Sequence, residues 1–152
     1  MPLKFADAKL LATTLQDIRA DGDGGGAEWC VFSYAARNCV EFVAKGAGGI
    51  DGLVKEVGSD TVIGRERLHS AIHYVYIKLQ RGEGMSKETR FCLYTCVPKD
   101  VSSMGRAVVV PHKGAIAAIF SPFTAHAEIM GIAELTQDAV EREAKFYVDW
   151  QS

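Results

Sequence analysis

The sequence has little net charge, no long apolar run and no CxxC pair of cysteines. Its 17 lysines and arginines against 19 aspartates and glutamates give a formal charge of -2, so no global attraction to nucleic acid or anionic lipid is expected. The most apolar window, AVVVPHKGAIAAIF, contains the interruption Pro-His-Lys, which argues against a membrane span. The N-terminal MPLKFADAKLL lacks the apolar core of a secretory signal. We therefore expect a cytoplasmic protein.

The four cysteines, Cys30, Cys39, Cys92 and Cys96, form no CxxC motif, and each has apolar or aromatic neighbours. We expect buried thiols, with metal ligation and disulfide bonds as the alternatives. The remaining composition is that of a globular protein, with 48% hydrophobic and 24% charged residues in 152 positions. That length predicts a single domain, residues 1–152, with its own core.

Hydrophobic periodicity predicts an order of helices and strands along the chain. The helices are expected at 7–20, 53–57, 113–123 and 136–150, and the strands at 29–34, 38–43, 68–79, 91–97, 106–110 and 127–132. Asp7 and Thr136 are the expected N-caps, and Pro122 should kink or end the third helix because proline lacks the backbone N–H. This order predicts an α+β fold with a mixed sheet covered by helices, and it does not match the βαβ alternation of dinucleotide-binding folds.

The strand at 68–79 alternates clearly between two faces. One face is expected to carry Ile72, Tyr74, Tyr76 and Lys78, and the other His73, Val75, Ile77 and Leu79. The strand at 91–97 is mostly apolar and is expected inside the sheet, whereas 127–132 is expected at an edge.

The stretch GEGMSKETRFCLYTC, residues 82–96, permits two interpretations. Gly82, Gly84 and Lys87 loosely resemble a phosphate-binding loop, which requires a helix directly after it so that the helix N-terminus faces the anion. The chain from Thr89 onward instead has strand character. We therefore favour the tip of a β-hairpin, with nucleotide binding as the weaker alternative.

Two further patterns resemble metal sites. DGDGGG resembles the start of a calcium loop, but Gly25 stands at the third acidic position and Phe32 near the place of the bidentate glutamate. His69 and His73 are four residues apart, yet on a strand they would be about 13 Å apart, too far to share one metal ion. The same distance argument applies to the last two cysteines. We predict no metal site and no cofactor.

No nucleophile, base and orienting acid stand out as a catalytic set. Such residues meet only in the folded chain, so a small enzyme stays a minor alternative. We predict a protein that is not an enzyme.

The stretch MSKETRFCLYTCVPKDVSSMGRA resembles the coactosins, actin-filament-binding members of the actin-depolymerising factor/cofilin homology family. The resemblance is carried by Met85, Ser86, Lys87, Arg90, Phe91, Val101, Ser102, Arg106 and Ala107. The order of elements along the chain is similar to that of the family as well. This resemblance implies a central mixed sheet of five or six strands with helices on both faces. It also implies binding along the side of actin filaments, without severing, depolymerisation or catalysis.

The resemblance also implies which residues contact actin. Arg90 occupies the position of a basic residue important for filament binding, Lys87 that of a hairpin-tip lysine and Lys113 that of a lysine opening the long helix; Arg106 is expected to assist them. The exposed face of the long helix carries only Gly114, Ala115, Ala117 and Ala118, so weak or no binding to monomeric actin is expected. The alternative is that the same cations bind phosphoinositides or another anionic ligand. We expect a monomer.

Overall fold

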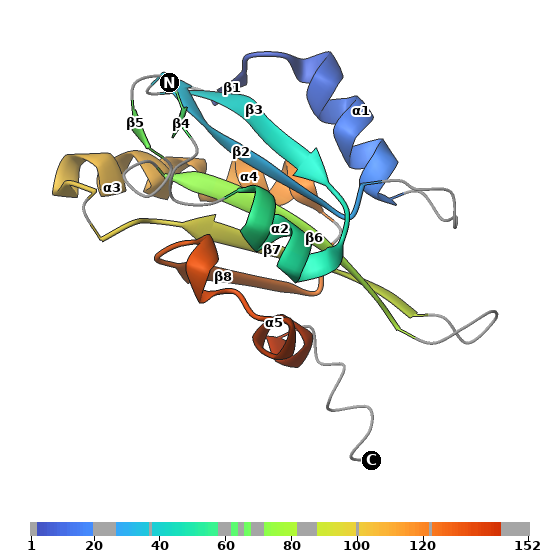
Figure 1. Ribbon diagram of the computed structural model, residues 1–152. Helices are drawn as coiled ribbons and strands as arrows, with labels where there is room; N and C mark the ends of the chain where they lie inside the picture. The colour runs from blue at the N-terminus through green and yellow to red at the C-terminus, as the bar shows by residue number, and fades with distance from the viewer. Residues whose placement is uncertain are drawn as a thin grey trace.

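The computed structural model describes residues 3–19, 27–36, 38–57, 62–63, 66–67, 72–81, 88–99, 101–121 and 123–143. Its elements, labelled in Figure 1, are β1 Lys4–Phe5, α1 Ala8–Arg19, β2 Trp29–Ala36, β3 Cys39–Gly46, α2 Gly49–Glu56, β4 Val62–Ile63, β5 Glu66–Arg67, β6 His73–Arg81, β7 Glu88–Cys96, α3 Ser103–Val109, the 3₁₀ turn η3 Val110–His112, α4 Lys113–Phe120, β8 Ala125–Ile129, the 3₁₀ turn η4 Ile132–Glu134 and α5 Gln137–Glu143.

Six strands form one mixed sheet in the order β1-β3-β2-β6-β7-β8. The four inner strands β3, β2, β6 and β7 pair with one another antiparallel, and β1 and β8 add parallel to β3 and β7 at the two edges. Helices α1 and α4 pack on one face, and α2 and α5 on the other. The predicted mixed sheet with helices on both faces is confirmed, and β8 is the expected edge strand. The separate β4–β5 ribbon and the two-residue β1 were not predicted.

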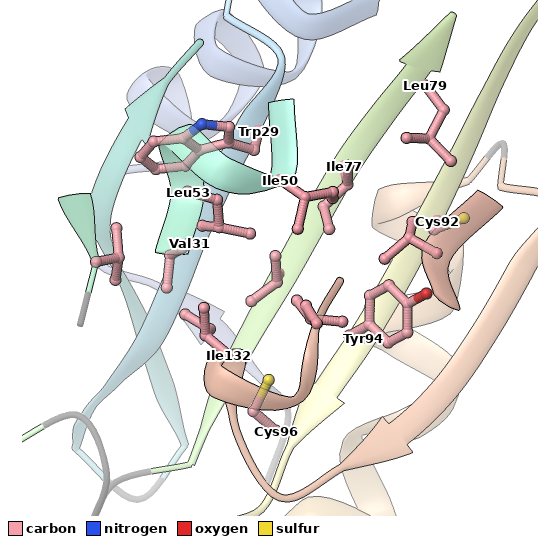
Figure 2. Close-up of a cluster of buried hydrophobic side chains, with 14 residues drawn as sticks. Trp29, Val31, Ile50, Leu53, Ile77, Leu79, Cys92, Tyr94, Cys96 and Ile132 are labelled. Atoms are coloured by element: carbon pink, nitrogen blue, oxygen red, sulfur yellow. The ribbon is translucent and has the colours of Figure 1, made fainter. Parts of the chain in front are cut away.

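Each face of the sheet has its own hydrophobic core because side chains alternate along the strands. Val75, Ile77 and Leu79 of β6 enter the core beneath α2 and α5; Figure 2 labels Ile77 and Leu79 among its side chains. Tyr74 and Tyr76 enter the other core, beneath α1 and α4. The division predicted for this strand is confirmed from His73 to Leu79, and residues 68–71 lie outside the described part of the chain.

The predicted caps are present at the helix ends. The backbone N–H of Leu10 donates to Asp7 Oδ1 at 2.9 Å, and that of Ala139 donates to Thr136 Oγ1 at 3.1 Å. Helix α4 ends at Phe120, and Ser121 is extended with φ −62° and ψ 140°, as expected for a residue that precedes proline. The long helix therefore stops before Pro122, three residues earlier than predicted. The last helix is described only to Glu143, so 144–150 of the predicted range lie outside the description.

The prediction of a strand at 106–110 is wrong, because Arg106 lies in helix α3, Ser103–Val109. The β-branched run Val108–Val110 suggested a strand, but the preceding residue pattern starts a helix. The Ser102 hydroxyl accepts a hydrogen bond from the Gly105 N–H at 3.1 Å, which is an N-cap. Val109 then packs in a small buried cluster with Ile72 and Val97. Packing and capping thus override β propensity here.

The other predicted ranges differ from the observed ones only at their ends. The helix predicted at 53–57 begins earlier, at Gly49, and the strand predicted at 38–43 continues to Gly46. Among the described residues, none of the helices combines the length and the apolar character that crossing a membrane requires.

Candidate protein-interaction surface

Strands β6 and β7 form a long hairpin around the stretch that suggested a phosphate loop. They pair from His73 with Cys96 out to Arg81 with Glu88, and the hairpin extends away from α3 (Figure 1). The element that follows GEGMSK is therefore strand β7 and not a helix, so the phosphate-loop interpretation is wrong. Residues 82–87, including Lys87, lie outside the described part of the chain.

Arg90 lies near the start of β7, on the face that α2 and α5 cover. It pairs across the ladder with Leu79, a member of that core, and alternates in step with buried Cys92. Its guanidinium lies 3.3 Å from the Glu88 carboxylate, and its side chain is 21% exposed. Part of its charge is thus offset by a carboxylate on the same strand.

Arg106 and Lys113 lie on the helical segment formed by α3, η3 and α4, seven residues and about two turns apart. Both are exposed, and no acidic residue occurs between Ser103 and Phe120. Around them, Met104 is 78% and Val110 64% exposed. Spacings of three and four residues continue this apolar stripe. We call the following set the α3–α4 surface: Met104, Arg106, Ala107, Val110, Pro111, Lys113, Gly114, Ala115 and Ala118.

The structure brings together two of the four predicted site residues. Arg106 and Lys113 share the α3–α4 surface, whereas Arg90 points to the opposite face of the sheet. That opposite face has a different charge balance, because η4 and α5 carry Glu134, Asp138 and Glu141 there. Arg90 therefore does not share one surface with Arg106 and Lys113, and Lys87 lies outside the described residues.

A buried chain of hydrogen bonds fixes the junction between α3 and α4. His112 lies in η3, with Nε2 3.2 Å from Asn38 Oδ1 and Nδ1 2.9 Å from the Tyr34 hydroxyl, which is 2.6 Å from that of Tyr74. Because Asn38 Oδ1 can only accept, Nε2 donates to it and Nδ1 accepts from Tyr34, whose oxygen then accepts from Tyr74. The ring is neutral in this arrangement, and burial lowers the pKa of His112 below its ordinary value of 6.5.

Acidification should destabilise the fold through His112. The depressed pKa keeps the folded ring neutral at pH values where the unfolded chain binds a proton. The neutral ring therefore contributes to the free energy of unfolding above about pH 6.5. As the pH falls from there towards the folded-state pKa, this contribution is lost, and the free energy of unfolding decreases by at most about 1.4 kcal/mol per pH unit. Urea denaturation at about pH 7.5 and about pH 5 measures it, and His112→Asn should reduce the pH dependence relative to wild type. Equal pH dependence in both proteins would contradict the role of the ring.

His126 provides the reference for that measurement. Burial first, and then the charge of Lys113, lower its pKa as well, so it contributes in the same direction. It remains in the His112→Asn protein, and the difference between the two proteins isolates His112.

Arg19 ties the end of α1 to the end of α4, a contact that the sequence did not indicate. Its Nη2 donates to the carbonyl oxygens of Ile119 at 3.2 Å and Ser121 at 2.6 Å. The guanidinium also lies 5.7 Å from the centre of the Tyr76 ring. A cation at the end of a helix stabilises the unpaired carbonyls there, so Arg19 holds α4 in place.

The histidines, cysteines and carboxylates are the candidates for a metal-ligating group, and the cysteines are also the candidates for a reactive thiol. The described residues include no group of three or more histidines, cysteines, aspartates and glutamates placed to hold a metal ion. All four cysteines are thiols, and three of them are buried. Burial raises the pKa of the Cys30 and Cys96 thiols, which makes them unreactive. The prediction of buried thiols is confirmed for all but Cys39, which is partly exposed.

Comparison with known proteins identifies similar sequences and structures. The family model for cofilin/tropomyosin-type actin-binding protein matches residues 5–145. Coactosin of Dictyostelium discoideum is 28% identical over 94 residues, which make up 62% of this chain and 58% of that protein. Human coactosin-like protein has a TM-score of 0.72 at 21% identity, covering 94% of this chain and 98% of that one. Mouse coactosin, described as an actin filament binding protein, has a TM-score of 0.67 at 22% identity, covering 100% and 99%. At these identities the structural likeness shows the shared fold.

Proposed function

The chain belongs to the cofilin/tropomyosin-type actin-binding protein family, and from this premise we propose that it binds along the side of actin filaments without severing or depolymerising them. The matched coactosin of Dictyostelium and the similar fold of mouse coactosin, a filament-binding protein, support this proposal. We place its action in the cytoplasmic actin cytoskeleton, as a monomer and without catalysis.

The α3–α4 surface is the observation that carries the proposal. It combines exposed apolar groups at Met104 and Val110 with two cations, and it contains no carboxylate. An apolar helical stripe fits a groove on a partner in helix-in-groove mode, and Arg106 and Lys113 complement an acidic partner surface such as the side of an actin filament. The small residues Gly114, Ala115 and Ala118 offer few polar contacts, in keeping with weak or absent binding to monomeric actin.

The β6–β7 hairpin is the second proposed contact. Arg90 stands near the tip end of its ladder, on the side of the sheet opposite α4. Lys87 belongs to the tip sequence, outside the described residues. A partner that contacts both this hairpin and the α3–α4 surface has to reach two sides of the molecule, which a polymer with neighbouring subunits provides. The hairpin contribution is expected to be the smaller one because Glu88 already offsets part of the Arg90 charge.

Cosedimentation with actin filaments tests the hairpin contact. The double variant Lys87→Ala with Arg90→Ala should weaken binding by roughly three- to tenfold, since each lost surface contact contributes up to about 1 kcal/mol. The wild-type affinity should also fall as salt rises. Lys55→Ala, an exposed cation of α2, is the matched control and should bind as wild type does.

Two results would count against these assignments. If the Lys87→Ala with Arg90→Ala protein pellets as well as wild type at every salt concentration, the hairpin is not a contact. If wild type slows nucleotide exchange on monomeric actin at the concentrations that saturate filaments, the weak monomer binding inferred from the alanine face is wrong.

Binding to an anionic membrane is the second candidate function. The favouring observation is that exposed Met104 and Val110 stand beside Arg106 and Lys113, an arrangement that suits insertion into a negatively charged lipid surface. Flotation with vesicles that contain or lack phosphoinositide discriminates the two, because filament binding requires no lipid. Flotation with neither vesicle would eliminate this candidate.

A further inference from the structure

A groove of about 770 Å³ runs between α1 and α4, next to but separate from the α3–α4 surface. It is lined by Ile119 of α4 and by six residues of α1, namely Ala8, Leu11, Ala12, Leu15, Gln16 and Arg19. Their spacing of three and four residues follows one complete face of the helix. From Ala8 to Arg19 this face is about 16 Å long, at 1.5 Å per residue.

Helix α1 places a cation at or beside each end of this groove. Arg19 lines one end, and Lys9 lies beside the rim at the other end, one helical position from Ala8. Both carboxylates of this segment have partners: Asp7, at the same end as Lys9, accepts the capping hydrogen bond of the Leu10 N–H, and Asp17 is 3.4 Å from Lys45 of β3. No ion pair joins Lys9 or Arg19 to a carboxylate within the described ranges. Helix α4 contributes no acidic residue at all.

We propose that this groove docks a short amphipathic helix of a partner protein whose polar face is acidic. The lining is apolar along the first two turns of α1, at Ala8, Leu11, Ala12 and Leu15, and this length matches the apolar stripe of a short helix. The small side chains of Ala8 and Ala12 allow another helix to approach closely, at the usual 8 to 10 Å between axes. Carboxylates on the docked helix then meet Lys9 and Arg19 at the two ends.

The positions of Lys9 and Arg19 determine which charge the docked helix should carry. The Arg19 guanidinium is held in place by the carbonyl oxygens of Ile119 and Ser121, so it presents a preorganised donor. Those carbonyls also offset part of its charge, and Lys9 supplies the second positive end. A basic or neutral helix with the same apolar stripe lacks these two contacts. Charge therefore selects among helices that fit the groove equally well.

A labelled peptide tests the proposal by fluorescence anisotropy. The probe is a three-turn helical peptide with leucines at i, i+3, i+4 and i+7 and with glutamate as its only charged residue. It should bind wild type at least about tenfold more tightly than the same peptide with lysine in place of glutamate. Ala12→Trp, which fills the groove from an exposed position, and Lys9→Glu should each weaken the glutamate peptide about tenfold. Thr13→Trp, on a side of α1 away from the groove, should leave it within twofold.

The controls separate this site from the filament surface. Circular dichroism establishes that the variants are folded, and amide shifts on adding the peptide should concentrate in residues 8–19 and near Ile119. Ala12→Trp should cosediment with filaments as wild type does, because the α3–α4 surface is unchanged. Equal binding of both peptides, binding that survives Ala12→Trp, or loss of filament binding in that variant would each overturn the proposal.

Discussion

Replacing Trp29 with alanine is expected to lower the free energy of unfolding by about 3–5 kcal/mol, the range for deleting a buried aromatic side chain. The indole is 0% exposed and belongs to the core beneath α2 and α5 (Figure 2). Its Nε1 donates to the Ala47 carbonyl at 3.2 Å, so the substitution leaves a cavity and removes a hydrogen bond. Since domains of this size are stable by about 5–15 kcal/mol, urea denaturation should show a large fall in the midpoint.

The backbone beside the indole provides an internal control. A Cβ atom at Gly46 would lie 2.5 Å from Cζ2 of Trp29, so Gly46→Ala should be destabilising in wild type. Phenylalanine at position 29 lacks the outer benzo ring of the indole, to which Cζ2 belongs. In a Trp29→Phe background, Gly46→Ala should therefore lower the free energy of unfolding by less than it does in wild type. A double-mutant cycle measures the difference. Strictly additive effects would show that the two residues are not in the tight contact described.

Reversing both charges of the α3–α4 surface should have the largest effect on filament binding. Arg106→Glu with Lys113→Glu changes the local charge by four units without touching a buried group. The repulsion replaces attraction to an acidic partner, so affinity in cosedimentation should fall more than about tenfold. The residual binding should also depend less steeply on salt than that of wild type.

The matched control reverses two exposed cations elsewhere, Lys9→Glu with Lys55→Glu on α1 and α2. This protein has the same net charge as the test variant, so a general effect of net charge would weaken both equally. We expect binding close to that of wild type. Equal loss in both variants would contradict a localised contact on the α3–α4 surface.

Much of the fold could be predicted because local patterns and packing agree. The alternation of His73 to Leu79 and the caps Asp7 and Thr136 are local signals that the tertiary structure uses. Helix α3 was mistaken for a strand because the Val108–Val110 run outweighed the Ser102 cap. Strands β1, β4 and β5 are two residues each, too short to show any periodicity.

The site was harder to predict than the fold. The sequence resemblance named Arg106 and Lys113, which the structure places together on one exposed surface, but it did not place Arg90 across the sheet from them. Which face a strand residue points to is visible in the sequence, whereas which helices cover that face depends on the whole fold. The hydrogen bonds from Arg19 to the end of α4, and the contact of Tyr34 with His112, join residues 78 to 102 positions apart in the sequence. No local pattern signals such pairs.

The division of charge across the sheet affects how the molecule meets a partner. Cations without carboxylates on α3 and α4, and the acidic residues of η4 and α5 on the reverse side, give a nearly neutral protein an electric dipole moment through the thickness of the sheet. In the field of a negatively charged polymer, such a dipole experiences a torque that turns α3 and α4 towards the polymer before contact. If the α3–α4 surface is the contact proposed above, productive collisions should become more frequent at low ionic strength, although the net charge of -2 would by itself repel the protein.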